Sequence, residues 1–349
     1  MKILITGNQG YVGSVLSTYL RKKYPEYYLV GLDTGYFSSC ITEFDFLPES
    51  YLNKQIFADV RLANFDFLDD FDSIVHLAGI SNDPIGNFHE TITNDINTEA
   101  SKKIINNSLK SKIKTFVFAS SCSIYGNTGN LIKDEFSDLL PLTAYAKSKV
   151  DIEKFINSIS DSKIFFTNLR FATACGNSPR LRLDLVLNDF VTSSILNNEI
   201  EILSDGEAMR PLIDVYDMCR AIDWGIHRNN LYPDEKKINI NIGSRANNFK
   251  IKELANLVSN QVNNCEVKFI NRENKDNRSY EVNFTKFNNI AYDFNPVISI
   301  EQSVDNLYKA IKKINFQNNK FRESNYIRLF KIKDLIKNNN LNKDFYWIK

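Results

Sequence analysis

The chain has 349 residues, of which 43% are hydrophobic and 24% are charged, and its formal net charge is +1. This size predicts one large α/β domain with a smaller appended lobe, and the near-neutral charge gives no electrostatic reason to expect nucleic-acid or membrane binding. Met1–Thr6 leads straight into a strand pattern without the arrangement of a signal peptide, and no apolar run reaches the roughly 18 residues that cross a bilayer. We therefore expect a cytoplasmic protein whose partner is a small molecule.

Short runs rich in Val, Ile and Phe alternate with helical patterns along the first half of the chain. Strands are expected at Lys2–Thr6, Tyr28–Asp33, Gln55–Asp59, Ser73–Ala78, Thr115–Ser120 and Ile164–Leu169. Helices are expected between them, among others at Val12–Lys23, Ile96–Leu109 and Tyr145–Ile159. This alternation predicts a Rossmann-type, doubly wound parallel sheet with right-handed crossovers.

The alternation weakens after Phe171, where a smaller lobe is expected to cover the carboxyl edge of the sheet. A helix pattern runs from about Leu185 to Leu196, whereas a strand at Ile238–Ile242 and a helix at Ile251–Val258 are expected to return to the main sheet. We therefore assign residues 1–172, with returning segments at about 211–258, to the cofactor domain. Residues 173–210 and 259–349 then form the interleaved substrate-binding lobe and a C-terminal appendage.

The appendage begins in an Asn- and Lys-rich stretch near Lys312. Tyr326, Leu329, Ile332 and Ile336 keep a helical spacing, which favours a packed segment over the alternative of a solvated tail.

Three glycines, Gly7, Gly10 and Gly13, follow the first strand and open the first helix. Gly7 permits a tight turn, Gly10 lets the backbone approach a pyrophosphate, and Gly13 allows close packing of helix and strand. The start of this helix, with Tyr11 and Val12, offers free N–H groups to an anion. A glycine-rich turn that binds nothing is the alternative.

Asp33 ends the second strand twenty positions after Gly13, where its carboxylate can accept hydrogen bonds from an adenosine ribose. Because the same carboxylate would repel a 2′-phosphate, and no arginine follows it closely, NAD is favoured over NADP. Further edge residues expected to contact the cofactor are Asp59, Val60, Leu77, Ala78 and Gly79. His76 lies within an apolar run and is interpreted as a core histidine.

Tyr145 and Lys149 stand at positions i and i+4, on one face of a helix. A phenol has a pKa of about 10 and is a poor base at neutral pH, so its phenolate needs roughly 4 kcal/mol of preferential stabilisation, which a neighbouring ammonium and an oxidised nicotinamide can supply. Upstream, the buried strand from Thr115 opens into a small-residue turn that delivers the hydroxyl of Ser121 to the same edge of the sheet. We predict Ser121, Tyr145 and Lys149 as the catalytic residues, with Tyr145 and Lys149 also contacting the cofactor.

Together these residues resemble the extended short-chain dehydrogenase/reductases, specifically the nucleotide-sugar epimerase/dehydratase family, over nearly the whole chain. Further segments that carry the likeness are His76–Ala78, Ser120–Gly126, Leu169–Phe171, Ser204–Gly206 and Arg210–Asp217. The resemblance implies an NAD-dependent enzyme with a nucleotide-sugar substrate. It also implies that Arg210, and Arg278 further on, grip the substrate diphosphate.

Three departures from the family pattern narrow the expected reaction. Ser121-Cys122-Ser123 stands where the sugar 4,6-dehydratases carry Thr-Asp-Glu, so dehydration is disfavoured for lack of the acidic pair. Thr173 replaces a frequent asparagine of the substrate pocket. The stretch Gly176–Leu185 with Asn188 resembles a subgroup that includes enzymes oxidising GDP-heptoses at C4, so Thr173 and Asn188 join the expected substrate contacts.

The resulting hypothesis is oxidation of a sugar at C4 by NAD, most simply within a nucleotide-sugar 4-epimerase. A 4-dehydrogenase or ketoreductase that releases its product uses the same residues, and a non-catalytic NAD-sensing protein on this fold is the rival from another class. The resemblance further suggests a homodimer through the helices near Ile96–Leu109 and Tyr145–Ile159.

No metal site is expected. The three histidines are scattered, and the five cysteines are widely spaced without a C-x-x-C pair, so neither a zinc site nor a disulfide framework is supported. We expect reduced, mostly buried thiols at Cys40, Cys122, Cys175, Cys219 and Cys265.

Overall fold

A computed structural model describes residues 1–348 except 43–45, 82, 271–278, 315 and 317–319. Within these residues the main sheet has seven parallel strands in the order β11-β7-β5-β4-β1-β2-β3. Their bounds are β1 Lys2–Thr6, β2 Tyr28–Asp33, β3 Lys54–Phe57, β4 Ser73–His76, β5 Thr115–Ser121, β7 Phe165–Phe171 and β11 Lys237–Ile242. The predicted doubly wound Rossmann-type sheet is confirmed.

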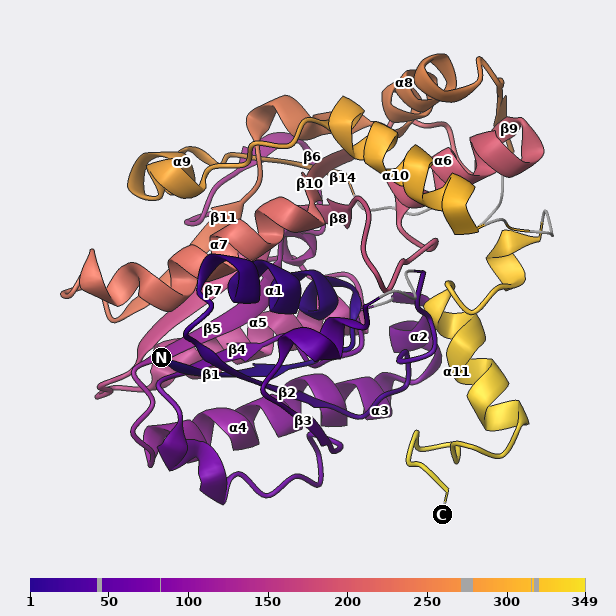
Figure 1. Cartoon of the computed structure of the whole chain (residues 1–349). Coiled ribbons are helices and arrows are strands. Elements are labelled where there is room, and N and C mark those ends of the chain that lie inside the picture. Colours follow the sequence, from indigo (N-terminus) through magenta and orange to yellow (C-terminus); the bar gives the residue numbers. More distant parts are fainter. Residues whose placement is uncertain (43–45, 82, 271–278, 315, 317–319, 349) are drawn as a thin grey trace.

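Both faces of this sheet are buried under helices, which explains why its strands are continuously apolar. Successive side chains of a strand point to opposite faces, so Ile3 and Ile5 of β1 join one core and Leu4 joins the other. The first face is covered by α1 (Tyr11–Lys23) and α7 (Val215–His227), the second by α4 (Ala100–Leu109) and α5 (Ala144–Ser158) (Figure 1). Between them lie the short helices α2 (Asp83–Phe88) and α3 (Glu90–Asn94) and one π-helical turn at Asp95–Glu99.

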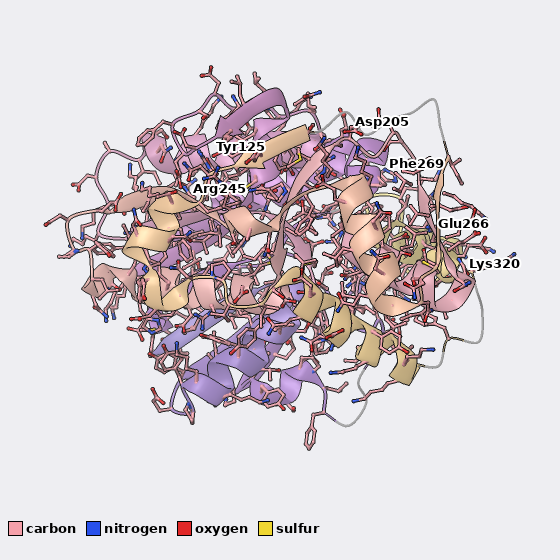
Figure 2. All side chains as sticks on the ribbon, turned by 90° about the horizontal axis from the view of Figure 1, so that it is seen from above. Tyr125, Asp205, Arg245, Glu266, Phe269 and Lys320 are labelled. Carbon is pink, nitrogen blue, oxygen red and sulfur yellow. The ribbon has the colours of Figure 1, made fainter. Side chains whose placement is uncertain are left out.

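The small lobe has its own core and stands above the carboxyl edge of the sheet. Its elements are β6 Asn127–Lys133, β8 Thr173–Cys175, α6 Val186–Asn197, β9 Glu199–Ile202, β10 Met209–Asp214, β12 Asn248–Lys250, α8 Ile251–Val262, β13 Glu266–Phe269, β14 Ser279–Val282 and α10 Ile300–Ile314. The short helix α9 (Thr285–Ile290) instead packs beside β11, with Phe287 in the core of the main sheet. Figure 1 shows α6, α8 and α10 together. Figure 2, seen from above, places the labelled Asp205, Glu266 and Phe269 on the lobe side, away from Tyr125.

One expected helix belongs to a different layer from the one predicted. The helix expected at Ile251–Val258 spans Ile251–Val262 and packs against α6 and β9 of the small lobe, not against the main sheet, because Leu254, Ala255 and Val258 face the lobe core. The strand expected at Ile238–Ile242 does join the main sheet as β11, paired in parallel with β7. The chain thus crosses between the two layers more often than predicted.

The packed C-terminal segment that the sequence favoured is confirmed. α11 (Arg328–Lys337) buries Ile332 and Leu335, and it lies beside α2 of the large domain (Figure 1).

His76 is a core histidine, as expected. Its Nδ1 lies 2.7 Å from Thr6 Oγ1 and its Nε2 lies 2.8 Å from Ser101 Oγ. Because the Ser101 hydroxyl donates to the carbonyl of Asn97, Ser101 accepts from Nε2–H and Nδ1 accepts from Thr6. The neutral imidazole is therefore fully hydrogen-bonded, and burial lowers the pKa of His76 to about 3.

Candidate active site

A cleft of about 730 Å³ opens where the carboxyl ends of the main strands meet the small lobe. In doubly wound sheets ligands bind at this edge, where the strand order reverses, here between β1 and β4. The residues predicted from the sequence that line the cleft are Gly7, Gly10, Tyr11, Val12, Gly13, Asp33, Asp59, Val60, Leu77, Ala78, Gly79, Ser121, Tyr145, Lys149, Thr173 and Arg210. Of the two remaining predicted residues, Asn188 is not among them and Arg278 lies outside the described residues.

The glycine turn leaves no room for side chains. Gly7 has a φ of +75°, and a Cβ there would lie 2.6 Å from the backbone nitrogen of Ala78. A Cβ on Gly13 would lie 2.5 Å from the Cα of Asn8. α1 starts directly after Gly10 with no side-chain cap and no acidic residue in its first turn, so its positive end faces the cleft free for an anion.

Asp33 lies at the end of β2, and backbone groups hold its carboxylate in place. Gln9 N–H donates to Oδ2 at 3.0 Å, and Gly35 N–H donates to Oδ1 at 2.8 Å. Burial raises the pKa of Asp33, while these two hydrogen bonds oppose the rise. The carboxylate thus meets the cleft in a fixed orientation.

The side chain of Asp59 is engaged in a way that the sequence reasoning missed. β3 ends at Phe57, and the Asp59 carboxylate beyond it makes an ion pair with Arg61 at 2.6 Å. No spacing rule points to Arg61, because its position also depends on hydrogen bonds to the carbonyls of Asp344 and Phe345.

Tyr145 and Lys149 lie on α5, whose start is fixed by a side-chain cap. Thr143 Oγ1 accepts from Ala146 N–H at 3.2 Å, which places Tyr145 in the first turn. The Nζ of Lys149 lies 5.3 Å from the Tyr145 ring centroid and 4.7 Å from that of Phe118. Burial lowers the pKa of Lys149 to about 8.

The predicted hydroxyl, Ser121, is the last residue of β5. Its Oγ accepts from Ser123 N–H at 3.2 Å and so caps the short helix Cys122–Tyr125, leaving the hydroxyl hydrogen for another acceptor. Ser123 lines the same cleft, and its buried Oγ has no hydrogen-bond partner in the described part of the chain. The sequence analysis does not identify Ser123, although its Ser-x-Ser spacing from Ser121 is a usable signal.

A buried ion pair connects α5 to the main sheet. Glu153, one turn after Lys149, pairs with Arg170 at 2.7 Å and accepts from Ser120 Oγ at 2.5 Å. Arg170 also donates to the hydroxyl of Tyr125 at 3.0 Å. These bonds tie α5 to β5 and β7, so the strand that carries Ser121 and the helix that carries Tyr145 keep a fixed relation.

Asn97, in the π-helical turn, is a further residue that the sequence reasoning missed. Its side chain brackets the backbone of Ile80, accepting from the N–H at 2.7 Å and donating to the carbonyl at 2.9 Å. It also donates to Ser148 Oγ at 3.2 Å. Asn97 thereby holds the Gly79–Ile80 loop against α5, and π-helical turns often occur at functional sites.

The substrate side of the cleft is lined by lobe residues. Thr173 of β8 pairs in register with Leu212 of β10, and Arg210 of β10 lies with its guanidinium 5.4 Å from the Tyr280 ring centroid. Arg210 is 6% exposed and donates to the carbonyl of Met209 at 2.9 Å. Its fork geometry suits a diphosphate at this position.

Asn188 does not reach the cleft. It is fully buried, its Oδ1 accepts from Gly176 N–H at 3.1 Å, and its Nδ2 donates to the carbonyl of Arg182 at 2.9 Å. These bonds give Asn188 a structural role, because they hold the turn at Gly176. The Tyr11 hydroxyl donates to the carbonyl of Gly176 in this turn at 2.6 Å. Arg278 lies outside the described residues.

The five cysteines are free and buried, as expected. Within the described ranges, no cluster of three or more His, Cys, Asp or Glu side chains is arranged to bind a metal ion, and no helix is long and apolar enough to cross a membrane.

A family model described as the NAD dependent epimerase/dehydratase family matches residues 3–243. The protein described as an uncharacterized UDP-glucose epimerase, YtcB, of Bacillus subtilis is 28% identical over 270 residues, which cover 74% of this chain and 82% of that protein. Protein CapI of Staphylococcus aureus is 30% identical over 232 residues, 64% of this chain and 68% of its own.

The crystal structure of UDP-glucuronic acid 4-epimerase from Bacillus cereus, in complex with UDP-glucuronic acid and NAD, has a TM-score of 0.75 at 20% identity. The match covers 90% of this chain and 100% of that one. At this level of identity the likeness shows a shared fold.

Proposed function

The chain belongs to the NAD dependent epimerase/dehydratase family, and from this premise we propose that it is a nucleotide-sugar 4-epimerase. The observation that carries the proposal is the content of one cleft: the glycine turn, the Tyr145–Lys149 pair, Ser121 and Arg210 all line it. Cofactor, proton acceptor and diphosphate contact are thus close enough to serve one bound sugar.

NAD is the cofactor of this family, and the cofactor side of the cleft fits it. The uncapped start of α1 suits the pyrophosphate, and the Asp33 carboxylate is oriented to accept from ribose hydroxyls. A 2′-phosphate would meet that carboxylate, which favours NAD over NADP. Bound there, the nicotinamide ring supplies the hydride acceptor.

On this proposal Tyr145 takes the proton of the sugar 4-hydroxyl while C4 gives up its hydride, which leaves a 4-keto sugar. The Lys149 ammonium stabilises the phenolate form of Tyr145 by charge, and with a pKa of about 8 it is still protonated at neutral pH. Ser121 donates its hydroxyl hydrogen to the reacting oxygen.

Return of the hydride to the opposite face of C4 completes an epimerisation, which requires the ketone to turn over inside the cleft. Arg210 supports this requirement, because a group anchored through its diphosphate keeps the nucleotide in place while the sugar ring rotates. Thr173 lines the sugar side of the cleft, and Arg278 remains a predicted second phosphate contact.

Dehydration is disfavoured because the acidic pair that eliminates water is absent from this turn. The Cys122 thiol is buried, donates to the carbonyl of Arg170 at 3.1 Å, and has its pKa raised by burial. It cannot act as an acid or base on a sugar at neutral pH.

The test is to incubate purified protein with UDP-, GDP-, dTDP- and CDP-sugars, following the reduced cofactor by absorbance and the sugar by chromatography. Interconversion of C4 epimers without accumulated NADH is expected. Stoichiometric NADH with a released ketone would indicate a 4-dehydrogenase instead, and no conversion of any sugar would leave an NAD-sensing protein.

A Tyr145→Phe variant provides the matched control, because it removes one oxygen and keeps the ring. We expect kcat to fall by roughly 10²- to 10⁴-fold, the usual contribution of a general base, with NAD affinity unchanged. A variant as fast as its parent would contradict the assignment of Tyr145.

The homodimer through α4 and α5 and the cytoplasmic location belong to this proposal. Five free, buried thiols support a reducing compartment. Light scattering of the purified protein tests the dimer.

A further inference from the structure

Residues 328–348, which we call the C-terminal strap, pack against the cofactor side of the large domain. α11 lies beside α2 (Figure 1). The strap contributes four side chains to the same buried core as β1 and β2, namely Ile332, Leu335, Leu341 and Phe345. Three strap residues, Arg328, Ile332 and Phe345, also line the cleft.

The end of the strap is a closed turn. The side chain of Asn342 accepts from the N–H groups of Asp344 and Tyr346, both at 2.9 Å, and Phe345 adopts a φ of +62°. Leu341 and Trp347 face each other across an isolated antiparallel bridge. The turn is therefore preorganised.

This turn is fastened to the segments that follow β2 and β3. The indole N–H of Trp347 donates to the carbonyl of Thr34 at 2.7 Å, and the hydroxyl of Tyr36 donates to the carbonyl of Phe345. Thr34 directly follows Asp33, the residue expected at the adenosine ribose.

Arg61 makes the second fastening. While it pairs with Asp59, it donates to the carbonyl of Asp344 at 2.8 Å, and its guanidinium carbon lies 3.8 Å from the Tyr346 ring centroid. The edge residues expected to contact adenosine and the end of the chain are thus joined through one guanidinium.

Arg328 brings a buried cation to the cleft. It is 3% exposed, stacks 4.5 Å from the Phe37 ring centroid, and donates through Nη2 to the carbonyl of Arg180 at 2.8 Å. Its Nη1 has no hydrogen-bond partner, and no ion pair of Arg328 is found among the described residues. Burial, together with the nearby cations Arg182 and Arg180, lowers the pKa of Arg328 to about 10.

The loop that Arg328 contacts leads to the start of α1. Ser178 Oγ donates to the carbonyl of Tyr11 at 2.7 Å, and the Arg180 guanidinium pairs with Glu49 at 2.8 Å. Asp33 and Asp184 act by charge on Arg180 and Arg328, respectively, but among the described residues two nitrogens of Arg180 and Nη1 of Arg328 have no hydrogen-bond partner. Buried donors without acceptors are costly, and a dianion in the cleft would satisfy them.

We propose that the C-terminal strap is part of the NAD site, with Arg328 binding the pyrophosphate and the 342–347 turn closing the adenosine end. The strap thereby slows cofactor release, so that one NAD serves many turnovers.

The first experiment compares Arg328→Met with Lys337→Met, which removes an exposed cation from the same helix. Calorimetry on protein stripped of cofactor measures NAD, ADP-ribose, adenosine and UDP-glucose. We expect Arg328→Met to weaken NAD and ADP-ribose by roughly 10- to 100-fold, as for a lost charged hydrogen bond, with adenosine and UDP-glucose within twofold. Weakened UDP-glucose with unchanged NAD would assign Arg328 to the substrate diphosphate and overturn the proposal.

The second experiment tests the turn through Tyr346→Ala and Trp347→Ala, with the exposed Ile348→Ala as control. Release of bound NAD into excess ADP-ribose is followed after rapid mixing. Each aromatic variant should release NAD about tenfold faster, the size of one ring or hydrogen-bond contact, and should bind adenosine more weakly. Thermal unfolding of the stripped variants checks that they fold. Folded variants that release NAD at the parent rate would overturn the role of the turn.

Discussion

The two sides of the cleft are built by different means. At the glycine turn of the cofactor side, Gly7 and Gly13 face backbone atoms at distances that no Cβ tolerates, so this part of the surface is main chain. On the substrate side, charged side chains line the wall and neutralise one another. Arg322 pairs with Asp189 at 2.9 Å and with Glu201 at 2.8 Å.

This difference explains how one family combines a constant cofactor with several reactions. A binding surface made of backbone does not tolerate substitution of its glycines, because an added side chain collides with main-chain atoms. A surface made of paired side chains can exchange partners while keeping its charge balance. A substitution in the glycine turn should therefore abolish folding or NAD binding, whereas a substitution on the substrate side should only weaken substrate binding.

The largest effect is expected from Gly13→Ala. The new Cβ would lie 2.5 Å from both Asn8 Cα and the Gly7 carbonyl oxygen, and backbone cannot yield as a flexible side chain does. We expect a loss of about 3 kcal/mol in unfolding free energy together with loss of NAD binding, measured by denaturant unfolding and calorimetry. Gly86→Ala is the control, since its Cβ would meet no atom closer than 3.7 Å. A Gly13→Ala protein with the unfolding free energy and NAD affinity of its parent would contradict the contrast between the two sides.

Arg210→Met tests the substrate side of the cleft. Loss of a charged hydrogen bond to the substrate diphosphate should raise KM for the nucleotide-sugar roughly 10- to 100-fold, with NAD affinity and unfolding free energy close to those of the parent. Arg210→Lys should recover part of the loss, because it restores charge without the fork. If NAD binding fell instead, Arg210 would belong to the cofactor side.

Acid should lower the unfolding free energy of the protein through His76, which is buried in the main sheet. Between pH 6.5 and about 3 the unfolded chain binds a proton that the folded imidazole refuses, so stability falls as the pH falls. The cost at pH 5 is about 2 kcal/mol. His76→Gln should flatten the decline in denaturant titrations across this range.

His227 supplies a control of opposite sign. Burial acts against its charged form, but hydrogen bonds to Asp223 raise the pKa of His227 overall. Its contribution is complete below pH 6.5 and is lost as the pH rises through the raised value. His227→Gln should therefore abolish the gain in stability as the pH falls from the raised value to 6.5 and leave the slope below pH 6.5 as in the parent. A changed slope below pH 6.5 would contradict the assignment.

The smallest effect is expected from Ser123→Ala. Removing a buried hydroxyl without a partner should leave the unfolding free energy unchanged or slightly higher. If Ser123 contacts the sugar, KM should rise by about threefold to tenfold, the value of one neutral hydrogen bond. An unchanged KM would exclude Ser123 from the substrate side.

The sequence could predict those parts of the site whose residues are neighbours along the chain. The glycine turn, Asp33 and the Tyr145–Lys149 pair each follow from a local period or spacing, and all line the cleft. Asn188 was misplaced because its direction depends on how α6 turns against the lobe, which no local pattern records. Asn97 and Arg328 were missed because their partners lie far away in the sequence. Arg61 pairs with the nearby Asp59, but its contact with the carbonyl of Asp344 depends on the fold.

Local patterns also could not show which of the two domains a helix packs against. The amphipathic pattern of Ile251–Val258 shows that this helix buries one face, and it is the choice between two cores that local periodicity leaves open. Strand ends shifted by up to two residues for a similar reason: β7 continues to Phe171 because β5 and β11 extend alongside it.

The burial of Leu341 and Phe345 in the core of the amino-terminal domain has a consequence for synthesis on the ribosome. This core cannot be completed until both residues have left the exit tunnel, although Leu4, Val30 and Leu32 in the same core are made hundreds of residues earlier. A chain truncated before Leu341 would therefore leave that core open to water.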